Sequence, residues 1–208
     1  MSLSSSEIAF PFDAEGWCQG ATTLASPNFD ARPAGMAVDL LVIHNISLPA
    51  GQFGTPYVAD LFCNRLDADA DPSFAELRGL RVSSHFLISR DGSLVQFVSI
   101  KCRAWHAGSS SHAGRDRCND FSIGVELEGS DETAFTDAQY DILSRLTCAL
   151  QNALPLTDVA GHEHIAPGRK TDPGPHFDWL RYRNLLLHLP SPGTASHLSR
   201  QLRFPPGT

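Results

Sequence analysis

The segment Val38–His44 is a nearly continuous run of apolar residues that ends on a histidine. Runs of this length are typical of strands that are buried on both faces of a sheet. Alternation along such a strand places Leu41 and Ile43 on one face and His44 on the other. The pattern therefore predicts a central strand with His44 at its carboxyl end, either as a hydrogen-bonded core histidine or as a functional residue.

A second strand of the same kind is predicted over Ser122–Leu127. Its apolar side chains share one face, whereas Glu126 and the following Glu128 share the other. Burial of a carboxylate is costly unless the group is paired or its pKa is adjusted. One of these glutamates is therefore a candidate functional residue, and position alone does not say which.

Other segments complete the pattern of an α/β (α+β) domain. Ser84–Ser89 and Ser93–Val98 flank an Asp-Gly pair and predict a β-hairpin. Thr136, with a glutamine three residues later, predicts a capped helix that carries a long apolar stripe. A shorter helix is expected with Thr55 as its N-cap and Pro56 as its first residue, and another over about Asp178–Leu187. Interspersed strands and helices predict a central mixed β-sheet flanked by helices.

The length of 208 residues fits one domain with extensions. Residues 1–36 contain several Pro and Gly residues and are interpreted as an irregular lead-in packed on the domain. Residues 37–189 hold the predicted elements. Residues 190–208 are rich in Ser, Pro and Gly, and we expect a loosely ordered tail with no core to join.

The loop Gly161–Gly174 gathers imidazole, ammonium and carboxylate groups in a stretch that is too rich in Pro and Gly to predict a helix. An ordinary charged surface loop is the alternative interpretation. If His44 and Glu126 lie at strand ends near this loop, one cleft collects all these groups. Two imidazoles and one carboxylate make a common catalytic zinc set that leaves a position for water.

Charge and cysteine usage limit the partners and the compartment. The net charge of −7 argues against nucleic acid and anionic membranes as partners, and no apolar run is long enough to cross a bilayer. Within this acidic chain, residues 101–120 are locally basic, which suggests an anionic ligand or a solvated loop. Five cysteines without a CxxC spacing, and a start without a cationic and apolar leader, favour a reduced, cytoplasmic protein.

Four ordered segments resemble the AmpD family, the cytoplasmic 1,6-anhydro-N-acetylmuramyl-L-alanine amidases of bacterial cell-wall recycling. These segments are residues 42–49, 104–108, 118–129 and 161–174. Together they are far more specific than any one of them, and the resemblance spans roughly Gly16–Arg183. It implies the type 2 amidase fold shared with peptidoglycan-recognition proteins, with a zinc cleft at the strand ends.

The resemblance also implies roles for particular residues. Three positions match the zinc ligands of the family: His44, His162 and Asp172. Two match its acidic and cationic catalytic residues: Glu126, rather than Glu128, and Lys170. Four match positions that contact the muropeptide: Asn45, Arg81, Trp105 and Arg117. One departure is Gly-His-Glu-His at positions 161–164, where most members read Gly-His-Cys-Asp; this keeps His162 but makes His164 easy to misread as a ligand.

The function implied is zinc-dependent hydrolysis of the amide between the D-lactyl group of 1,6-anhydro-N-acetylmuramic acid and L-Ala of the stem peptide. We expect a monomeric cytoplasmic enzyme whose partner is the small anhydro-muropeptide, and the family links this activity to β-lactamase induction. The alternatives are an amidase that acts on intact peptidoglycan and a muropeptide-recognition module without catalysis. The sequence has no Gly-x-Ser-x-Gly segment that would favour a serine hydrolase.

Overall fold

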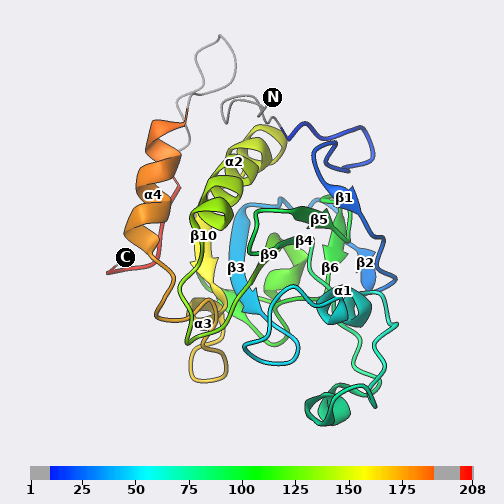
Figure 1. The fold of residues 1–208 in the computed structure, drawn as a ribbon. Helices are drawn as coiled ribbons and strands as arrows, with labels where there is room; N and C mark the ends of the chain where they lie inside the picture. The colour runs from blue at the N-terminus through cyan, green and yellow to red at the C-terminus, as the bar shows by residue number, and fades with distance from the viewer. Residues whose placement is uncertain (1–9, 190–201, 208) are drawn as a thin grey trace, which may run out of the picture.

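The computed structural model describes residues 10–189 and 202–207. Within them, a mixed sheet of six strands in the order β1-β5-β4-β9-β3-β10 forms the centre of the fold (Figure 1). In that order the strands span Thr22–Thr23, Leu94–Gln96, Phe86–Ile88, Ser122–Glu128, Leu40–Ile46 and Asp158–Gly161. The hairpin partners β4 and β5 are antiparallel, and every other neighbouring pair in this sheet is parallel. The predicted mixed sheet is confirmed.

Two small antiparallel pairs lie outside the main sheet. They join β2 (Phe29–Ala31) to β6 (Cys102–Ala104) and β7 (Ser111–His112) to β8 (Arg115–Asp116). Four α-helices and two 3₁₀ helices complete the described chain: α1 Tyr57–Phe62, η1 Pro72–Leu77, η2 Cys118–Asp120, α2 Asp137–Ala153, α3 His162–Ile165 and α4 Trp179–His188.

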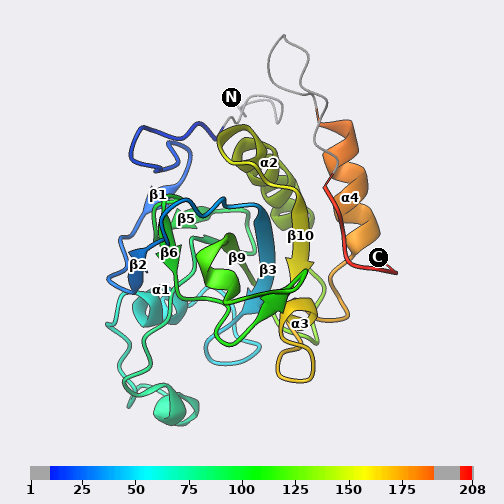
Figure 2. The same ribbon diagram turned by 180° about the vertical axis from the view of Figure 1, so that it is seen from behind.

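Helices cover both faces of the sheet, as predicted. On one face, Leu41 and Ile43 of β3 pack in one buried cluster with the apolar stripe of α2, whereas Leu40 and Val42 belong to a separate cluster on the other face. The helix α1 also packs on that second face, beside β4. Figure 2 shows α4 alongside α2, outside the sheet. The two-sided burial of β3 confirms the interpretation of its apolar run.

The ends of the long helices follow local capping rules. Thr136 Oγ1 accepts a hydrogen bond from the backbone N–H of Gln139 at 3.2 Å, and Gln139 Oε1 accepts one from the N–H of Thr136 at 3.1 Å, so the predicted capping box of α2 is confirmed. The helix α1 begins one residue later than predicted, because the hydroxyl of Thr55 donates to the carbonyl of Leu48 at 2.6 Å instead of capping the helix.

Two further local expectations differ from the structure. The loop 161–174 contains one helical turn, α3, directly after β10, so the expectation of no helix there is wrong for these four residues. The lead-in is not irregular throughout, because it supplies β1 at the edge of the main sheet, and β2. Residues 1–9 of the lead-in lie outside the described residues.

The end of the predicted tail joins the core. Arg203 forms a parallel bridge with Asp158, and its guanidinium pairs with the carboxylate of Asp158 at 2.5 Å. Leu202 and Phe204 pack against the cluster under α2. The expectation of no core to join is therefore wrong for residues 202–207, whereas 190–201 and 208 are outside the described residues. None of the described helices has the length and apolar character to cross a membrane.

Candidate active site

Three neighbouring strands bring the candidate residues to one edge of the sheet. His44 on β3 lies directly opposite Glu126 on β9 in the parallel register. On the other side of β3, Gly161 of β10 pairs with Ile43, and His162 follows as the first residue of α3. In open α/β sheets the carboxyl ends of parallel strands are where ligands bind. The imidazoles of His44 and His162 and the carboxyl of Glu126 therefore lie at the carboxyl ends of neighbouring strands.

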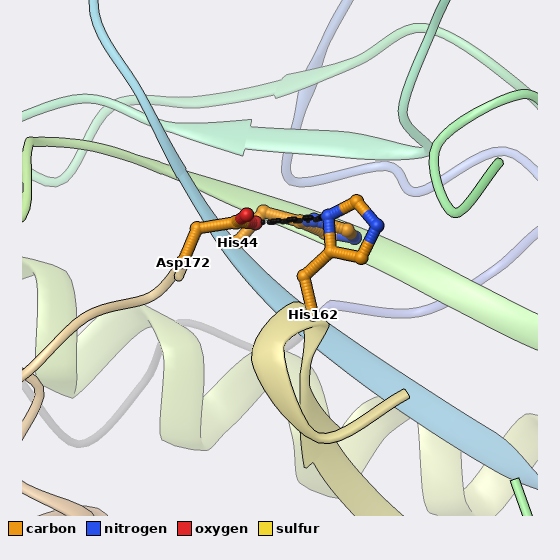
Figure 3. Close-up of side chains that lie close together, drawn as sticks. All are labelled: His44, His162 and Asp172. Atoms are coloured by element: carbon orange, nitrogen blue, oxygen red, sulfur yellow. Dashed lines mark hydrogen bonds and ion pairs between the residues drawn. The ribbon is translucent and has the colours of Figure 1, made fainter. Parts of the chain in front are cut away.

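His44, His162 and Asp172 form a compact cluster of potential metal ligands (Figure 3). His44 Nδ1 lies 2.9 Å from Asp172 Oδ2 and 3.0 Å from His162 Nδ1, and His162 Nδ1 lies 3.1 Å from Asp172 Oδ2. Zinc ligands at about 2.0–2.2 Å from the ion lie about 3.3 Å apart in a tetrahedron. The three donor atoms therefore need to separate by only a few tenths of an ångström to hold zinc, and their chemistry fits that ion.

The ionisation of this cluster also suits a metal. Burial lowers the pKa of His44, which favours the neutral imidazole that binds metals, although the hydrogen bond with Asp172 opposes this effect. Burial raises the pKa of Asp172, but hydrogen bonds with His162 and His44 outweigh it and hold the pKa of the carboxyl below its ordinary value. These shifts favour a neutral imidazole at His44 and a carboxylate at Asp172.

Glu126 differs sharply from its neighbour Glu128. Glu126 is 7% exposed, and its Oε2 has no hydrogen-bond partner among the described residues. Burial, and next the charge of Asp172, raise the pKa of Glu126 well above its ordinary value, while Lys170 lowers it. Glu128 instead accepts hydrogen bonds from the backbone N–H groups of Gly54 and Arg90, at 2.5 and 3.0 Å. The geometry favours Glu126 as the proton-transferring group and gives Glu128 a structural role.

An open cleft of ≈ 460 Å³ leads to this edge of the sheet. Its lining includes the exposed side chains of Arg81 and Lys170, together with Trp105 and His162. The indole N–H of Trp105 donates to Asp30 at 2.8 Å, which fixes the ring at the rim. The cleft thus brings together two of the four residues predicted to contact a muropeptide.

The other two predicted contact residues lie elsewhere, and neither is among the described residues that line the cleft. The side-chain amide of Asn45 donates to Asp131 at 2.7 Å and to the carbonyl of Pro173 at 3.0 Å, so it holds the loop next to Asp172. The side chain of Arg117 is 71% exposed and pairs with Asp120 at 3.3 Å. Contact with a muropeptide stays a prediction for all four positions.

His164 is not part of the metal cluster. Its Nδ1 accepts a hydrogen bond from the backbone N–H of Gly161 at 3.0 Å, and its ring packs edge-on against Trp179. His106 has no predicted role, although it lies in the segment 104–108 that resembles the family. His106 Nδ1 lies 3.0 Å from His44 Nε2. A histidine between Trp105 and Ala107, inside a segment that matches the family, was the available signal.

A mixed α/β sheet that ends in two imidazoles, an aspartate and an unpaired buried glutamate carries the kind of donor set that metal-dependent hydrolases use. The sequence model of the N-acetylmuramoyl-L-alanine amidase family (Amidase_2) matches residues 34–175, and the chain belongs to this family. The predicted family and fold are confirmed.

Known relatives cover most of the chain. The chain is 54% identical over 174 residues to the 1,6-anhydro-N-acetylmuramyl-L-alanine amidase AmpD of Escherichia coli, a match that covers 83% of this chain and 95% of that protein. A crystal structure of a selenomethionine derivative of AmpD aligns with a TM-score of 0.81 at 53% identity, covering 84% of this chain and 98% of that one. The E. coli amidase AmiD, solved with anhydro-N-acetylmuramic acid-L-Ala-D-γ-Glu-L-Lys as substrate, aligns with a TM-score of 0.53 at 28% identity, covering 85% of this chain and 65% of that one.

Proposed function

We propose that this chain is a zinc amidase that hydrolyses the bond between the D-lactyl group of 1,6-anhydro-N-acetylmuramic acid and L-Ala of the stem peptide. The observation that carries the proposal is the unpaired carboxyl of Glu126 on the strand directly beside His44, next to a ligand cluster whose His162 lines the cleft. The similarity to relatives named for this reaction supports the choice of substrate. A cytoplasmic setting, a monomeric state and a part in β-lactamase induction stay predictions.

His44, His162 and Asp172 would hold the zinc ion. When bound, zinc supplies Lewis acidity that polarises a carbonyl and lowers the pKa of water. Glu126 accepts a proton from the attacking water as the new C–O bond forms. The protonated Glu126 then donates to the amide nitrogen as the C–N bond breaks, which leaves the lactyl carboxyl group and the free amine of L-Ala. The raised pKa makes the carboxylate of Glu126 a stronger base for the proton of the attacking water.

Lys170 supplies positive charge beside the reacting carbonyl. Its side chain is exposed in the cleft, on the loop between α3 and Asp172. An ammonium there stabilises the negative charge that develops on the carbonyl oxygen. The loop is held because the backbone N–H of Lys170 donates to the carbonyl of Ala166 at 3.1 Å.

Lys170→Met is expected to lower kcat by about 10²–10³-fold, the usual cost of losing one donor to a developing oxyanion. Zinc content and unfolding temperature should stay close to those of the wild type, because the ammonium is exposed. Lys101→Met is the matched control: it removes the same charge at an exposed residue that is not among those lining the cleft. Equal kcat for the two variants would contradict the role of Lys170.

The direct test of the proposed function is mass spectrometry of 1,6-anhydro-muramyl-tripeptide after incubation with the purified protein. We expect free tripeptide and the anhydro-sugar, with the products lost on chelation and restored by zinc. Intact sacculi incubated in parallel distinguish an amidase of the polymer. A folded, zinc-loaded protein that cleaves neither substrate would overturn the proposal and favour a recognition module.

A further inference from the structure

The ring of His106 and the backbone carbonyl of Ala107 lie against the far side of the two imidazole ligands. His44 and His162 each turn Nδ1 toward Asp172, which leaves the Nε2 atom of each ring facing away from the cluster. His44 Nε2 lies 3.0 Å from His106 Nδ1, and His162 Nε2 lies 3.1 Å from the carbonyl oxygen of Ala107. Two adjacent residues thus contact the free nitrogen of both ligands.

The positions of the protons follow from these contacts. A ring that binds a metal through Nδ1 keeps its lone pair there and carries its proton on Nε2. His44 Nε2–H therefore donates, and His106 Nδ1 accepts only when the proton of His106 is on Nε2. That Nε2 lies 3.1 Å from the hydroxyl of Ser122, which donates its own proton to the carbonyl of Cys118 at 2.6 Å. Each donor in this chain of hydrogen bonds, from His44 through His106 and Ser122 to Cys118, therefore has an acceptor.

Neighbouring residues leave room for the ring of His106 and hold its backbone in place. A Cβ atom at Gly124 of β9 would lie 2.5 Å from Cγ of the His106 ring, so glycine at this position leaves the space that the ring occupies. The side-chain oxygen of Asn119 accepts hydrogen bonds from the backbone N–H groups of His106 and Ala107, at 3.1 and 2.8 Å. The guanidinium of Arg169 donates to the carbonyl of Ala107 at 2.9 Å.

We propose that His106 and Ala107, held by Asn119, are positioning residues that fix the tautomer and orientation of both imidazole metal ligands. Partners of this kind raise the basicity of a ligand and restrict its ring, and their loss typically weakens metal binding. The Ser122 hydroxyl sets the tautomer of His106 in turn. The inference rests on the zinc site of the proposed function and adds a second set of residues on which that site depends.

His106→Leu and His106→Asn form the test pair. Leucine removes the acceptor and keeps the site filled, whereas the asparagine side-chain oxygen reaches about the place of Nδ1. Zinc affinity is measured by competition with a chromophoric chelator, and the unfolding temperature of the zinc-free protein reports on the fold. We expect His106→Leu to weaken zinc binding about 10–100-fold, and His106→Asn to restore most of that loss.

A measurement on the unmodified zinc-loaded protein gives an independent result. Long-range ¹⁵N NMR of the histidine rings should find the proton of both His44 and His106 on Nε2. A proton on Nδ1 of His106, or wild-type zinc affinity in a folded His106→Leu, would overturn the inference and leave the proposed function intact. Failure of the wild type itself to bind zinc would overturn both.

Discussion

Glu126→Gln is expected to lower kcat for 1,6-anhydro-muramyl-tripeptide by about 10²–10⁴-fold, the usual contribution of a positioned general acid and base. The amide keeps the shape of the buried side chain but does not take up the proton of the attacking water. Zinc content should be unchanged, because Glu126 is not one of the three clustered donors. Steady-state kinetics with metal analysis of the same preparation measures both quantities.

Glu128→Gln is the matched control, since Glu128 shares the strand β9 and the face of the sheet with Glu126. Its carboxylate accepts backbone hydrogen bonds from Gly54 and Arg90. Loss of the charge should lower the free energy of unfolding by about 1–3 kcal/mol and leave kcat close to that of the wild type. If Glu128→Gln lost turnover while Glu126→Gln kept it, the assignment of the two glutamates would have to be reversed.

The sequence predicts best those elements whose pattern lies within a single segment of the chain. The apolar run of β3 and the Thr136 capping box of α2 each depend on residues within one element, and both were predicted closely. The pairing of His44 with Glu126 depends on two strands far apart in the chain, and no local pattern encodes that register. For the same reason, the contacts of Leu202 with the core were not predicted.

At the site, the difference between Glu126 and Glu128 also depends on residues far away in the chain. Alternation places both Glu126 and Glu128 on one face, so the sequence pattern treats them alike. What separates them is that Gly54 and Arg90, each far away in the chain, donate to Glu128. Only the resemblance to a family selected Glu126 in advance. No local pattern marks His106, because its partner His44 lies 62 residues away in the chain.

His162→Ala is expected to abolish stoichiometric zinc binding and, with it, turnover. The substitution leaves His44 and Asp172 as the remaining donors, and catalytic zinc sites use three protein ligands. The affinity for zinc should fall by more than about 100-fold, beyond the upper range for losing an outer partner of a ligand. Metal analysis after gel filtration and chelator competition measure the loss without reference to activity.

The matched control is His164→Ala, two residues further along the same short helix. His164 accepts a hydrogen bond from Gly161 and packs against Trp179, outside the cluster. Its loss should cost about 1 kcal/mol of stability and leave one zinc ion bound per chain. Zinc loss in His164→Ala with zinc kept in His162→Ala would show that the ligand is the second histidine of Gly-His-Glu-His. That outcome would contradict the geometry of the cluster, in which Nδ1 of His162 lies 3.1 Å from Asp172 Oδ2 and Nδ1 of His164 accepts a hydrogen bond from Gly161.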